Sequence, residues 1–164
     1  MSVAASIRHV RKALQDWGEA NDVSVGFRNL RDPLDLELED EKVLMRVMAQ
    51  RSPIRRKGQS RHLFVFEFHC ISKRGDLRSD GRTDRAEVLG SMLEQEFMEK
   101  DIAVYDVTAL QGGAGVPLGS LQFLSSSWRN GDQRGTIYGD SVDYTLETPK
   151  VEHWVVQMTA SLNA

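Results

Sequence analysis

The segment Arg61–Ser72 constrains the fold most, because its residues alternate in the manner of a β-strand. One face carries Phe64, Phe66, Phe68 and Cys70, and the other carries Leu63, Val65, Glu67, His69 and Ile71. A row of phenylalanines needs a covering layer, so we predict that this face packs in the core.

A second strand precedes this segment. Val43–Ala49 is a dense apolar run whose Leu and Met content would also suit a helix, and we interpret it as a strand because the loop at Pro53 closes it soon afterwards. Gln50–Arg61 contains Pro53, Gly58, two serines and five Arg or Lys residues, which is typical of an exposed loop. The sequence therefore predicts a hairpin, Val43–Ala49 with Leu63–Ile71, joined by a basic loop.

Two amphipathic helices are expected. The first is Val3–Trp17, with apolar residues at three- and four-residue intervals and a stop at Gly18. The second is Asp84–Lys100, with Thr83 or Asp84 as N-cap and Glu87 near its start. Its apolar stripe comprises Ala86, Leu89, Met92, Leu93 and Phe97.

The remaining segments complete a sheet. Ile102–Leu110 and Val151–Leu162 alternate as strands, Val23–Phe27 is a short strand or extended link, and Leu34–Glu39 is ambiguous. We expect an irregular glycine-rich excursion over about 111–147. At 164 residues, the chain is expected to form one α+β domain, residues 1–164, with a mixed, mainly antiparallel sheet and two main helices packed on one face.

Charge is distributed unevenly. Arg51–Arg85 holds ten bases and four acids, whereas Asp32–Glu41 holds six acids and no base. This polarity is compatible with head-to-tail self-association or with an extended charged partner, and equally with ordinary solvated loops. The clustered arginines of the basic loops are the best functional candidates because guanidinium groups bind phosphates or carboxylates.

Motifs for catalysis are missing from the sequence. Gly112–Gly119 resembles a phosphate-binding loop in glycine content but lacks the Gly-Lys-Ser/Thr sequence. Ser125–Ser127 lies outside any Gly-x-Ser-x-Gly turn, so we expect these serines to form hydrogen bonds in a loop. His62 and His69 face opposite sides of one strand, and the acidic run lacks EF-hand spacing. We therefore predict no catalytic residue, no metal site and no cofactor.

The chain also lacks signals for membranes or secretion. Its longest strongly apolar run, Leu63–Phe68, is far shorter than a membrane span and contains Glu67. The N-terminus lacks the apolar core of a secretory signal, so we expect folding in the cytoplasm. A lone Cys70 within a strand is expected to be a buried small hydrophobe.

The order of these elements resembles the tail terminator (tail-completion) proteins of long-tailed bacteriophages. The resemblance rests on the leading helix Val3–Trp17, the central hairpin, the second helix Asp84–Lys100 and the last strand Trp154–Leu162. In that family a mixed sheet packs helices on one side, and subunits close into a ring that caps the tail tube.

The resemblance implies a structural virion protein at the head-proximal end of the tail, assembled in the bacterial cytoplasm. Its implied partners are copies of itself in a ring, which we expect to be hexameric, the tail tube protein, the head-to-tail connector and passing genomic DNA bound without sequence specificity. The hairpin loop Ser52–Ser60 is our candidate for the lumen. The basic lumen or partner-facing candidates are Arg55, Arg56, Lys57, Arg74, Arg78 and Arg82. The acidic subunit-interface candidates are Asp35, Glu37, Glu39, Asp40 and Glu41.

Two other classes of function remain open at this point. One is a small monomeric nucleic-acid-binding module that uses the basic loops, and the other is an uncharacterised small enzyme whose site is assembled from distant residues. Neither is marked by a motif in the sequence.

Overall fold

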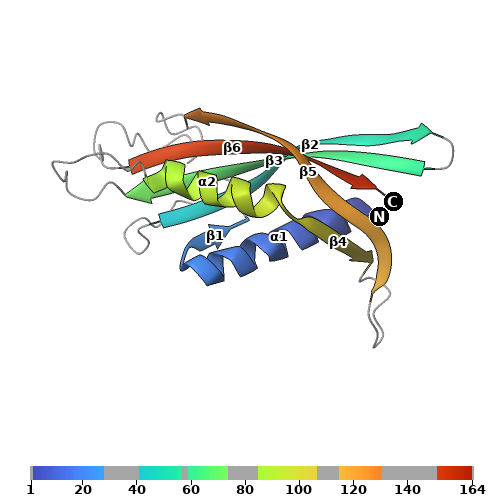
Figure 1. Ribbon diagram of the computed structural model, residues 1–164, viewed down its shortest axis with the longest axis horizontal. Helices are drawn as coiled ribbons and strands as arrows, with labels where there is room; N and C mark the ends of the chain where they lie inside the picture. Colours follow the sequence, from blue (N-terminus) through green and yellow to red (C-terminus); the bar gives the residue numbers. More distant parts are fainter. Residues whose placement is uncertain are drawn as a thin grey trace.

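A six-stranded curled sheet carries two helices on one face (Figure 1). The computed structural model describes residues 2–27, 41–56, 59–73, 85–106, 115–130 and 151–163. The elements are α1 (Ser2–Asn21), β1 (Ser24–Gly26), β2 (Glu41–Arg56), β3 (Gln59–Lys73), α2 (Arg85–Met98), β4 (Asp101–Asp106), β5 (Val116–Asn130) and β6 (Val151–Asn163). The strand order is β1-β2-β3-β6-β5-β4, and only the β1–β2 pair is parallel. The predicted α+β class, with a mixed and mostly antiparallel sheet, is confirmed.

The core lies between the helices and the phenylalanine face of β3. Phe64, Phe66 and Phe68 are fully buried, and the Phe68 ring lies 5.3 Å from the ring of Phe97 on α2. Three more predicted stripe residues of α2, Ala86, Leu89 and Leu93, are also fully buried. The predicted core is therefore confirmed, and the apolar faces of strand and helix cover each other as the two alternation patterns require.

Helix α1 is longer than predicted because Gly18 does not end it. The helix continues to Asn21, and Asp22 takes the left-handed conformation with φ 56°. The Val23 amide then donates to the Gly18 carbonyl at 2.9 Å, which is a Schellman-type closure. A Cβ at Gly18 would lie 2.7 Å from the Val23 oxygen, so the glycine permits close passage of the returning chain.

The basic loop predicted at Gln50–Arg61 is wrong in its extent. β2 continues to Arg56 and β3 begins at Gln59, so the hairpin is longer than the alternation indicated. Register shifts after Val47 and after Arg51 insert extra residues into β2, and Pro53 lies in the second shift. A bulge accommodates a proline without ending the strand, which explains the error.

The irregular excursion predicted over about 111–147 is also wrong for part of its length. Residues 116–130 form the strand β5, which pairs with β4 and β6. Gly119, with φ 139°, sits where β4 and β5 shift register, and a second shift follows Phe123. Bulges hide the two-residue period of a strand, which is why the alternation did not reveal β5.

The remaining predicted elements can be compared with the observed strands. The strands expected at Val43–Ala49, Arg61–Ser72 and Val151–Leu162 are confirmed, and so is the short strand expected within Val23–Phe27. β4 covers the first part of the strand predicted at Ile102–Leu110. The ambiguous run Leu34–Glu39 and the predicted N-cap at Thr83 or Asp84 lie outside the described residues.

Candidate functional site

The end of the β2–β3 hairpin forms a two-stranded extension, which we call the basic ribbon: residues 54–56 and 59–61. Arg61 pairs with Asn163, the last residue of β6, whereas Arg55 pairs with Ser60 and Arg56 with Gln59. Within the described ranges, no third strand pairs with those last two rungs. The hairpin extends beyond both helices, at the right of Figure 1. A short two-stranded extension is marginally stable without further contacts, so this end of the molecule suits a partner.

Two of the six predicted basic candidates, Arg55 and Arg56, lie within the described residues. Arg55 and Arg56 are the last residues of β2, so they lie on a strand rather than in a loop. Lys57, Arg74, Arg78 and Arg82 lie outside the described residues. Arg61 joins the ribbon, and its Nε donates to Ser161 Oγ at 2.8 Å, which ties β3 to β6 at the base of the ribbon.

Of the acidic candidates, only Glu41 falls within the described residues; Asp35, Glu37, Glu39 and Asp40 lie outside them. Arg85 donates to both carboxylate oxygens of Glu41, from Nε at 2.5 Å and from Nη2 at 3.2 Å. The hydrogen bond to Glu41 raises the pKa of Arg85 above its ordinary value. This bidentate pair joins the start of β2 to the start of α2, and the interface role of Glu41 stays a prediction.

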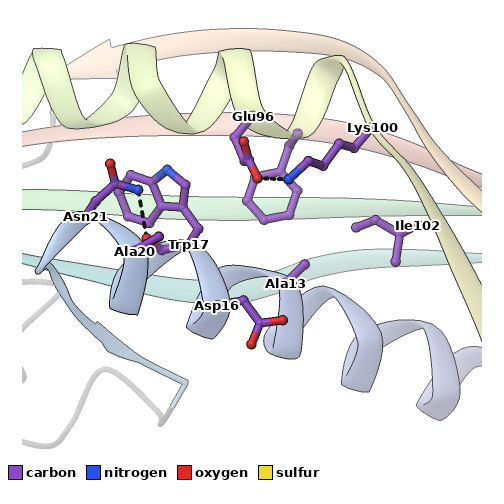
Figure 2. Close-up of a pocket in the computed structure, with 9 residues that line it drawn as sticks. Ala13, Asp16, Trp17, Ala20, Asn21, Glu96, Lys100 and Ile102 are labelled. Atoms are coloured by element: carbon purple, nitrogen blue, oxygen red, sulfur yellow. Dashed lines mark hydrogen bonds and ion pairs between the residues drawn. The ribbon is translucent and has the colours of Figure 1, made fainter.

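A groove of about 330 Å³ runs between α1 and α2 (Figure 2). Its apolar lining comes from Ala13, Trp17, Ala20, Phe97 and Ile102, and its polar lining comes from Asp16, Asn21, Glu96 and Lys100. Lys100 pairs with Glu96 across one turn, and Lys12 donates to both carboxylate oxygens of Asp16 at 2.9 and 3.1 Å. Sequence reasoning missed this groove because its two walls come from helices far apart in the chain.

A buried polar cluster was also missed. His69 on β3 and His153 on β6 share a hydrogen bond of 3.1 Å between Nδ1 and Nε2, and Glu67 Oε2 lies 3.5 Å from His69 Nε2. All three side chains are at most 7% exposed. No sequence signal links two histidines 84 residues apart before the β3–β6 register is known. The cluster joins two central strands and presents little surface to a solute.

The serines predicted to lie in a loop belong to a strand. Ser125–Ser127 lies within β5, and Ser126 Oγ donates to Glu94 Oε1 of α2 at 2.8 Å. Trp128 Nε1 donates to the other oxygen of Glu94 at 2.5 Å, and its ring meets that of Trp154 edge-on at 6.3 Å. These contacts fasten α2 to the sheet, so they account for both tryptophans as partly buried packing residues.

Over the residues that the structure describes, no group of three or more His, Cys, Asp or Glu side chains is placed to hold a metal ion. Cys70 is fully buried, as predicted, and burial raises the pKa of its thiol. Neither described helix is long and apolar enough to cross a membrane. Two surface features of the described residues are the projecting basic ribbon and the groove between α1 and α2.

Comparison with known proteins adds no relative to this picture. No protein-family model matches the sequence, and no curated protein matches it. The fold itself defines the chain as an α+β protein with a mixed, mostly antiparallel sheet.

Proposed function

We propose that this chain is a non-enzymatic structural protein of a long-tailed bacteriophage. Copies form a closed ring, sixfold by the family resemblance, that caps the tail tube and ends its polymerisation. The ring also provides the joint to the head connector, and it lies at the head-proximal end of the tail after assembly in the host cytoplasm.

The basic ribbon carries this proposal. Gln50–Arg61 contains five bases and no acid, and its described residues belong to the paired strands β2 and β3, which extend beyond the helices (Figure 1). A projecting arm of one charge suits contact with a neighbouring subunit, a tube subunit or passing DNA.

The architecture supports the proposal in a second way. A mixed sheet with two helices on one face, in the order helix, hairpin, helix and C-terminal strand, is what the resemblance to tail terminators implies. The analogy is one of fold and element order, so the function has to be tested at the ribbon.

One experiment replaces Arg55, Arg56 and Lys57 together by serine. Such surface changes usually alter stability by no more than about 0.5 kcal/mol, so the variant should fold. We expect it to complete particles poorly, since complementary charge at an interface sets encounter rate and register. Electron microscopy should then show tails of uncontrolled length or heads without tails.

The matched control is Arg46→Ser, which removes an exposed arginine from the same strand away from the ribbon. It should give normal particles. Length-controlled tails joined to heads in the triple variant would remove these three residues from the proposed site.

A monomeric nucleic-acid-binding module is the second candidate, because the same run of five bases would bind phosphates. It predicts a monomer whose retardation of DNA weakens steeply with salt and is lost in the triple serine variant. A ring that forms without DNA favours the first proposal.

A further inference from the structure

The groove between α1 and α2 has the character of a docking site for a chain segment. Trp17 and Phe97 form a largely buried apolar floor at 5% and 1% exposure, and Ile102 extends it from β4. Asp16 of α1 and Glu96 of α2 both line the groove, and the Asp16 carboxylate points away from α2 at its outer edge (Figure 2). An apolar floor between charged walls suits a segment that brings both apolar and charged residues.

The surroundings of the groove are acidic. Residues 12–22 and 95–101, which form its walls and the adjoining helix ends, hold six acids and two bases. Lys12 and Lys100 each lie one helical turn from an acid that they pair with. Such exposed pairs contribute little energy and exchange readily, so the net negative charge of this region remains available to an incoming cation.

The basic ribbon is complementary to this region. Its strand enters through Pro53 and Ile54 and then carries Arg55 and Arg56, so apolar and cationic residues adjoin. The ribbon extends away from the helices of its own chain (Figure 1), which directs it to another molecule.

We propose that the basic ribbon of one copy docks in the groove between α1 and α2 of the next copy. Each subunit then contributes two unlike surfaces, and repetition of such a head-to-tail contact closes into a ring. This inference rests on the ring of the proposed function and assigns the two faces that meet. It also places the acidic partner of the ribbon on the helices rather than on the segment Asp32–Glu41.

Charge reversal tests the contact. One variant carries Arg55→Glu and Arg56→Glu, and the other carries Asp16→Lys and Glu96→Lys. Like charges facing each other cost several kcal/mol, so each variant alone should lose at least about a hundredfold in self-association, measured by sedimentation velocity. Arg46→Glu and Glu87→Lys, on the same strand and helix but away from ribbon and groove, should assemble like the unmodified chain.

Mixing the two variants gives the sharper result. At the substituted positions, each ribbon of one variant then faces side chains of opposite charge in the groove of the other, so an equimolar mixture should regain full-size assemblies in which the variants alternate. A chain that carries all four reversals should assemble alone. Asp16→Asn with Glu96→Gln provides a milder groove variant, which should weaken assembly less, and circular dichroism checks that every variant folds.

The outcomes separate the two proposals. An unmodified chain that stays monomeric both free and in assembled particles contradicts the ring itself. If the unmodified chain forms a ring and either reversed variant assembles as well as its control, or the mixture stays dissociated, the docking of ribbon in groove is overturned while the ring stands.

Discussion

Phe66→Ala tests the packing on which every surface described above depends. Phe66 lies at the centre of β3, is fully buried, and pairs with Val47 on β2 and Met158 on β6. Its ring lies 5.8 Å from the rings of Phe64 and Phe123. Truncation therefore opens a cavity at a point where three strands and the helix layer meet.

The expected loss follows from these contacts. Truncating a fully buried phenylalanine costs about 3–5 kcal/mol, a range that covers the lost transfer energy and the cavity. A loss of about 4 kcal/mol should lower the melting temperature by roughly 8–16 °C for a domain of this size. It should also lower the urea midpoint by about 2 M at a slope of about 2 kcal/mol/M.

Thermal and urea unfolding followed by circular dichroism measure this effect. Leu124→Ser serves as the control, because Leu124 on β5 is 46% exposed and its replacement should change stability by no more than about 0.5 kcal/mol. An unchanged midpoint for Phe66→Ala, or an equal loss in the control, would refute the assigned core.

Three further predictions concern the helix layer and the thiol. Gly90→Ala should destabilise the protein by about 1–3 kcal/mol, because the new Cβ would lie 2.7 Å from two ring carbons of Trp128. This loss should outweigh the better helix propensity of alanine. The control Ser91→Ala, at an exposed site of the same helix, should not destabilise the protein. Glu94→Ala should lower the free energy of unfolding by about 1 kcal/mol, because it removes the acceptor of the Trp128 indole and of the Ser126 hydroxyl. Burial raises the pKa of the Cys70 thiol, so this side chain should remain neutral at pH 8 and react with a thiol reagent only after denaturation. Rapid labelling of the folded protein would contradict its burial.

The sequence predicted the parts of the fold in which one period runs without interruption. β3 alternates cleanly, and α2 repeats apolar residues every three or four positions, so the core residues of these two elements were correctly predicted. Prediction failed where a bulge resets the period, as at Pro53 in β2 and Gly119 in β5. The end of the first helix was wrongly predicted at Gly18 for a different reason. Glycine stands there because the returning chain packs closely against the helix, and the helix continues beyond it.

The candidate site was less predictable because its geometry depends on pairing between distant segments. Composition indicated the basic character of the hairpin, but only the register shows that its last rungs extend past β6. The groove needs α1 and α2 side by side, and the His69–His153 contact needs the order of strands in the sheet. Local periodicity carries none of this information.

The ring is the central claim, and particle mass and shape test it most directly. The chain, free at high concentration and in assembled tails, should be measured by light scattering and imaged by negative-stain microscopy. We expect closed rings with a mass of about 111 kDa, six times the 18.5 kDa of one chain, and the same ring at one end of each tail. A strictly monomeric chain in both settings would contradict the account.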